Sequence, residues 1–213
     1  MANLYVVDEG APHAEALMTW LATRGSPVVQ VRRRDDMTAI AFEIQRTAAR
    51  HPATHGRIRT LFLMAHGDAG LLRLGRGLTA ANAIELAPVH PCLHGGLLSS
   101  VCIYGCNVGS AVAADAHGGG TVETPWETPL HAGNVRAGTG YGLLRALAQT
   151  LAVRVSAPVI RQHLGPREYE HLLEGRAYQG PVLTVTPTGS FTIVRTDMHG
   201  NITSHQDSEL DFL

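Results

Sequence analysis

The order of apolar runs and amphipathic segments over residues 3–65 constrains the fold of this chain more than any other feature. The apolar runs at 3–8, 27–31 and 58–65 have the length and composition of buried strands. Between them lie two segments with helical periodicity, 11–24 and 36–50, the second of which Asp35 or Asp36 is suited to cap. This β-α-β-α-β order implies a parallel sheet with right-handed crossovers.

The rest of the chain extends this plan. We expect a small glycine-flanked hairpin at 67–75, a helix at 79–86, a fourth strand at 99–106, a helix at 141–151, a fifth strand at 153–157 and a hairpin within 181–195. Residues 107–138 are rich in glycine and proline and predict a long loop insertion. We therefore predict one domain over 1–195 with a C-terminal tail at 196–213. The fold class is a three-layer α/β/α arrangement with a mostly parallel sheet of about five or six strands.

Composition excludes several classes of partner. The net charge of −1 and the pI near 6.9 give no strong field to attract nucleic acid or an anionic membrane. No apolar run approaches the ~20 residues of a membrane helix, and the first residues do not resemble a signal peptide, so we expect a cytoplasmic protein.

Cys102 and Cys106 lie on one predicted strand about 13 Å apart, too far to form a disulfide, whose Cα atoms lie within about 7 Å.

Two of the predicted strands lead directly to chemically reactive side chains. Residues 61–65 are followed by His66 and Gly67, and the run 101–105 is followed by Cys106. A thiolate nucleophile needs an imidazole nearby to move protons, and adjacent strand ends of an open α/β sheet would bring the two together. Taken singly, His66 as a hydrogen-bonded surface histidine and Cys106 as an inert buried thiol are equally good interpretations. Their matching positions, each beside a glycine, favour the catalytic pair.

Other chemistries find weaker support in the sequence. His90, Cys92 and His94 could ligate zinc, but a second ligand pair at the usual spacing is missing, so we predict no metal and no cofactor. A Gly-x-Ser-x-Gly elbow for a serine hydrolase is absent. The glycines at 67–75 lack the Gly-Lys-Ser/Thr ending of a phosphate-binding loop.

The two motifs resemble those of the caspase-like clan of cysteine peptidases, which includes caspases, gingipains and CHAT domains. The closest resemblance is to the caspase-like domain of large bacterial surface proteins. Its first motif, Ser-His-Gly-x-x-Gly-x-Leu-x-Leu-Gly, is similar to residues 65–75, which differ at Ala65. Its second, Leu-Tyr-Gly-Cys-Asn-Val, is similar to residues 103–108. The segment 107–138 departs from the family, where the corresponding region is short.

The resemblance implies a caspase-like fold and a cysteine endopeptidase with a Cys106–His66 dyad. It also implies an oxyanion hole made by the backbone N–H groups of Gly67 and Cys106. The partner would be a protein or peptide substrate, and an activator protein or a homodimer stays open. Two alternatives remain: a catalytically silent interaction or regulatory module, and a thiol-dependent amide hydrolase or acyltransferase acting on a non-protein substrate.

Substrate specificity and regulation give two further predictions. By position, Tyr104 and Ser156 are candidates to line the substrate pocket, and Asp8 and Asp68 could make it acidic and select arginine or lysine. The alternative is that these acids cap helices or face solvent. Because residues 107–138 follow the nucleophile directly, we expect this segment to gate or activate the site, as a cleaved linker does in caspases. A surface elaboration without a role is the alternative.

Overall fold

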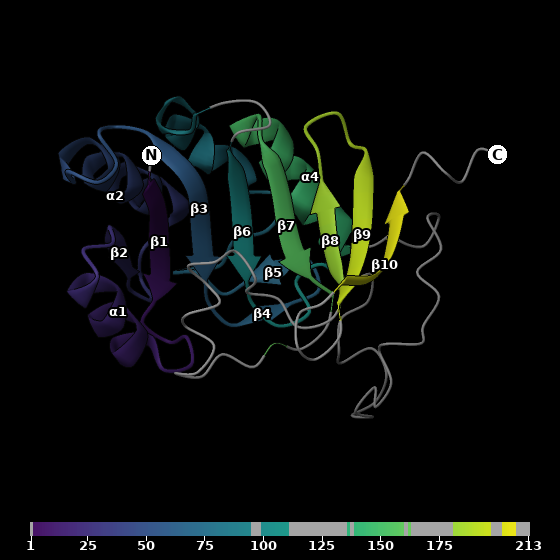
Figure 1. Cartoon of the computed structure of the whole chain (residues 1–213), viewed down its shortest axis with the longest axis horizontal. Coiled ribbons are helices and arrows are strands. Elements are labelled where there is room, and N and C mark those ends of the chain that lie inside the picture. Colours follow the sequence, from purple (N-terminus) through teal and green to yellow (C-terminus); the bar gives the residue numbers. More distant parts are fainter. Residues whose placement is uncertain are drawn as a thin grey trace.

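A computed structural model describes residues 2–94, 99–110, 136, 139–159, 162, 181–196 and 202–207 of the chain. Its main sheet holds eight strands in the order β10-β9-β8-β7-β6-β3-β1-β2, with β2 at one edge and β10 at the other (Figure 1). The strands are β1 (Ala2–Asp8), β2 (Val28–Val31), β3 (Ile58–Met64), β6 (Ser100–Tyr104), β7 (Arg154–Pro158), β8 (Val182–Val185), β9 (Phe191–Thr196) and β10 (Ile202–Asp207).

The direction of the strands divides the sheet into two parts. One part holds β2, β1, β3, β6 and β7, which run parallel to one another. In the other part, β8 is antiparallel to β7, and β9 and β10 continue the antiparallel pairing. The parallel part confirms the mostly parallel α/β sheet expected from the sequence. Because β2 and β3 lie on opposite sides of β1, the strand order reverses there. Open α/β sheets bind ligands at such a point, beyond the carboxyl ends of the strands.

Helices cover both faces of the parallel part. Helix α1 (Ala14–Thr23) packs Leu17 and Leu21 onto one face, where the rings of Tyr5 and Phe62 stack with their centroids 4.9 Å apart. The opposite face is covered by α2 (Met37–Arg50), the 3₁₀ helix η1 (Ala83–Cys92) and α4 (Thr139–Leu151). Alternate residues of β1, β3 and β6 feed the two cores, as the period of two in a strand requires.

Local sequence explains where the helices begin. Asp36 caps α2 as predicted, because its side chain accepts a hydrogen bond of 2.8 Å from the backbone N–H of Ala39. The helix expected at 79–86 is shifted in the structure to η1 and has 3₁₀ geometry. Pro88 and Pro91 lie inside η1, and their missing N–H groups are incompatible with a regular α-helical ladder.

Two expectations about the C-terminal part need correction. The sheet has more strands than the five or six predicted, because the hairpin β8–β9 and then β10 continue it past β7. β10 also lies within 196–213, which the sequence suggested was a tail. Its polar sequence, Ile-Thr-Ser-His-Gln-Asp, lacks the apolar alternation of a half-buried strand. Pairing with β9, rather than hydrophobicity, defines it as a strand.

Candidate active site

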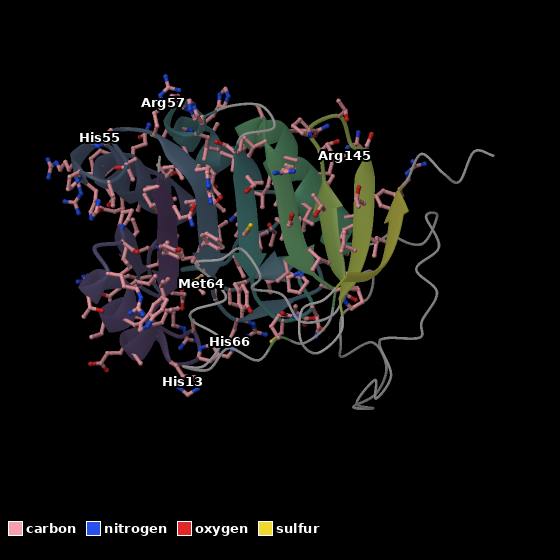
Figure 2. The ribbon with its side chains drawn as sticks, in the orientation of Figure 1. His13, His55, Arg57, Met64, His66 and Arg145 are labelled. Carbon is pink, nitrogen blue, oxygen red and sulfur yellow. The ribbon has the colours of Figure 1, made fainter. Side chains whose placement is uncertain are left out.

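The register between β3 and β6 brings the ends of these strands together. The two strands are parallel neighbours, and their last paired residues are Met64 and Tyr104. The hydrogen bond from the Ala65 N–H to the Tyr104 carbonyl, 3.1 Å long, continues this pairing by one residue. His66 and Cys106 each follow two residues after the last pair, and adjacent strands lie only about 4.8 Å apart. Figure 2 shows His66 just beyond Met64, at the carboxyl end of β3.

The backbone of Gly67 packs directly against the backbone of Cys106. A Cβ atom added to Gly67 would lie 2.8 Å from the carbonyl oxygen and 3.2 Å from the amide nitrogen of Cys106. It would also lie 2.4 Å from Cγ2 of Val108. Only glycine fits in this space. The two glycine-flanked motifs, far apart in sequence, are thus in van der Waals contact at the rim of the sheet.

The backbone N–H of Gly67 is not used for pairing within its own hairpin. Gly67 begins the short hairpin of β4 (Gly67–Asp68) and β5 (Leu71–Leu72), in which it faces Leu72. The Arg73 N–H donates to the His66 carbonyl at 2.7 Å, which makes the Gly67–Leu72 pair one of the non-hydrogen-bonded type. The Gly67 N–H therefore points away from β5. Such a donor, beside the Cys106 thiol, is placed to hydrogen-bond a negatively charged oxygen.

Hydrogen bonds fasten the hairpin region to the rim at both ends. Gly70 donates its N–H to the Val108 carbonyl at 3.2 Å. At the far end, the carboxylate of Asp8 accepts 2.8 Å hydrogen bonds from the backbone N–H groups of Gly10 and Gly75. Asp8 is only 6% exposed. Its place corrects the idea that Asp8 recognises substrate: its oxygens hold β1 to the hairpin segment.

The chain turns immediately after the nucleophile candidate. Asn107 adopts a left-handed conformation, with φ of 57°, and its carbonyl accepts a 2.8 Å hydrogen bond from the Ser110 N–H. Residues 106–109 form turns, and no helix begins within 106–110. The Sγ atom of half-buried Cys106 lies 3.6 Å from the carbonyl oxygen of Gln162, to which the thiol donates. No signal in the sequence pointed to Gln162.

The other proposed specificity residues differ in position. Tyr104 is 4% exposed and packs in the core under α1, so its ring faces that core. Ser156 pairs with Cys102, two residues before the end of β7, and its hydroxyl is 2.8 Å from that of Thr184. It therefore lies below the rim. Asp68 stands in the hairpin beside Gly67, half-buried, and its side chain accepts a 2.8 Å hydrogen bond from the Ala69 N–H.

The predicted insertion leaves and re-enters the fold at one place. The Gly140 N–H donates to the Ser110 carbonyl at 3.1 Å, which joins the first turn of α4 to the turn after Cys106. A Cβ atom on Gly140 would lie 2.5 Å from that carbonyl oxygen. Residues 111–135 lie outside the described residues. Ser110 and the first turn of α4 are therefore neighbours in the fold, and the insertion stays a prediction.

All three cysteines are free thiols, which confirms that Cys102 and Cys106 do not pair. Burial raises the pKa of the Cys92 thiol above its usual value, against a smaller lowering by Arg57. Cys92 closes η1, away from the rim, and is therefore less suited than Cys106 to nucleophilic chemistry. In the described part of the chain, no three histidine, cysteine or acidic side chains are grouped so that they could hold a metal ion.

Comparisons of the chain with protein-family models, with curated proteins and with solved structures found no match. Within the described residues, no helix is both long enough and apolar enough to cross a membrane.

Proposed function

We propose that this protein is a cysteine endopeptidase that hydrolyses peptide bonds through a dyad of Cys106 and His66. The proposal combines the resemblance of two sequence motifs to the caspase-like clan with the geometry of the rim. The close approach of Gly67 to the Cys106 backbone carries it. This approach aligns a nucleophile with a backbone donor that the hairpin leaves unused, which is the arrangement acyl transfer requires.

In the proposed reaction, His66 takes the proton of the Cys106 thiol, and the resulting thiolate attacks the carbonyl carbon of the scissile peptide bond. The carbonyl oxygen gains negative charge and accepts hydrogen bonds from the N–H groups of Gly67 and Cys106. As the tetrahedral intermediate collapses, the C–N bond breaks and His66 delivers a proton to the leaving amine. His66 then removes a proton from water, which attacks the thioester, releases the carboxylate product and regenerates the thiol.

The contact between the Cys106 thiol and the Gln162 carbonyl belongs to the ground state of this cycle. A thiol that donates to a carbonyl is not yet a thiolate. The substrate's approach would replace this contact, because both compete for the space above the sulfur. A thiol is a weak hydrogen-bond donor, so the loss of this 3.6 Å contact costs little.

Substitution of the dyad tests the proposal. Cys106→Ala and His66→Ala should each reduce the cleavage of a peptide-library substrate by several orders of magnitude. Because both residues follow the strands and lie outside the packed core, the urea midpoint of each variant should stay near that of the native protein. Cys102→Ala is the matched control, since this thiol lies on β6, below the rim. Full activity in Cys106→Ala would refute the assignment.

Two alternatives predict different results in the same assays. A silent interaction module would leave Cys106 no more reactive to a chloroacetamide probe than Cys102. An amide hydrolase or acyltransferase with a non-protein substrate would show fast labelling of Cys106 but no cleavage in the peptide library. Asp68 carries the remaining acidic-pocket hypothesis. A library preference for aspartate or small apolar residues before the scissile bond would refute it.

We further propose that the insertion gates access to Cys106. The support is that its base, the Ser110–Gly140 hydrogen bond, adjoins the turn that follows the nucleophile. Because the two ends meet, replacing residues 114–132 with a short glycine bridge should leave the core folded. The probe should then label Cys106 faster than in the native chain. Equal labelling rates and equal turnover would show that the insertion has no gating role.

A further inference from the structure

A second polar site lies at the turn between β8 and β9. An open cavity of about 330 Å³ is lined there by side chains of two kinds, guanidinium groups and hydroxyls, together with the turn glycine: Arg136, Tyr141, Arg145, Thr188, Gly189 and Ser190. In Figure 2, Arg145 lies beside this turn, at the opposite end of the sheet from His66. The site is thus separate from the proposed dyad.

Two arginines give this cavity a positive charge that no acidic side chain among its described lining residues balances. None of its described lining residues is acidic, and α4, which carries Tyr141 and Arg145, contains no aspartate or glutamate. The guanidinium carbon of Arg136 lies 5.7 Å from the ring centroid of Phe191, an aromatic contact that leaves the hydrogen-bond donors available. Both arginines are exposed to solvent, as a binding site for a soluble anion requires.

The turn itself is held rigidly against α4. The hydroxyl of Tyr141 donates a 2.7 Å hydrogen bond to the carbonyl of Gly189, and the Tyr141 ring packs edge-on against Phe191. Gly189 has φ of 89°, and a Cβ atom there would lie 3.6 Å from Nε of Arg145. The turn therefore presents the hydroxyls of Thr188 and Ser190 beside a guanidinium whose surroundings are already ordered.

We propose that this cavity binds a small phosphate-bearing ligand. A phosphate group offers three or more acceptor oxygens, which matches two guanidinium groups together with the hydroxyls of Thr188 and Ser190. A carboxylate offers only two. The volume is at the lower end of the range for small-molecule sites, so it accommodates a ligand larger than a single phosphate ion.

Binding of inorganic pyrophosphate to the full chain, measured by calorimetry at fixed ionic strength, tests the proposal. Succinate is the dicarboxylate comparator. We expect pyrophosphate to bind at least tenfold more tightly than succinate. At about one hundred times its Kd it should raise the Tm by about 5–10 °C. Equal binding of the two anions would overturn the preference for phosphate. No binding at millimolar pyrophosphate would overturn the proposal that this cavity is a ligand site.

Variants locate the binding in the cavity. Arg145→Gln should weaken pyrophosphate binding about tenfold or more, because it removes a charge-assisted contact, and Ser190→Ala should weaken it less. Arg145 is exposed and Ser190 is half-buried in a turn outside the core, so both changes should leave the fold intact. Arg50→Gln, at an exposed arginine on the last turn of α2, is the matched control and should bind like the native chain. Equal affinity in Arg145→Gln, or equal loss in Arg50→Gln, would refute the proposal. Neither result depends on peptidase activity.

Discussion

Replacing Gly67 with alanine should push the β4–β5 hairpin away from the turn at residues 106–109. The added methyl group would lie 2.4 Å from Cγ2 of Val108, whereas carbon atoms in contact are about 3.5–4.0 Å apart. It would also lie 2.8 Å from the carbonyl oxygen of Cys106. Because this oxygen belongs to the backbone, it cannot easily move aside. The hairpin must therefore shift by about 1 Å, at a cost typical of overpacking, about 1–3 kcal/mol.

The proposed peptidase activity should fall as well. A displacement of about 1 Å at reacting groups costs about 100-fold in rate, and here it moves the Gly67 N–H away from the position of the oxyanion. Urea unfolding measures the loss of stability, and the rate of peptide cleavage relative to the native chain measures the loss of activity. Gly142→Ala is the matched control. This glycine lies in α4 with nothing within 4 Å of an added Cβ, so alanine there should stabilise by about 0.5–1 kcal/mol.

A double-mutant cycle with Val108→Ala identifies the clash. Val108 is fully buried, so its truncation alone should destabilise the protein. In the double variant, part of the space for the new methyl group is restored, and we expect a favourable coupling of about 0.5–3 kcal/mol. The activity should stay low, because the contact with the Cys106 carbonyl remains. A Gly67→Ala protein with native stability and native turnover would refute the reasoning.

Two more predictions follow from buried polar groups. Asp8→Asn should lower the free energy of unfolding by about 1–3 kcal/mol, because its NH₂ group would face one of the two N–H donors, Gly10 or Gly75; an unchanged urea midpoint would contradict this role. For Cys92, whose folded-state pKa is raised, the unfolded chain loses its proton first, so stability should be constant below about pH 8 and decline as the pH rises above about 8.5. Cys92→Ser should reduce that decline in pH-dependent urea titrations, and equal slopes in the two proteins would rule out the contribution of Cys92.

Much of the parallel core could be predicted from the sequence, because its signals are local. Apolar runs, helical periodicity and the Asp36 cap each depend on neighbouring residues, and β1, β2, β3, β6 and β7 lie close to where these signals indicated. The hairpin between β8 and β9 was likewise visible in its turn residues. η1 was misplaced because a cap signal at Thr79 outweighed the prolines that follow. β10 was missed because a strand at the sheet edge needs little hydrophobicity to pair.

For the candidate site too, local sequence predicts one part and tertiary packing decides the other. The sequence by itself determined which residues are candidates for the proposed reaction, since His66, Gly67 and Cys106 stand out by type and by their place after apolar runs. Only the tertiary structure decided what surrounds them. Whether Asp8 faces a substrate or two backbone amides, and whether a carbonyl from Gln162 covers the thiol, depends on segments distant in sequence. Such contacts depend on how whole elements pack together, and no local pattern encodes them.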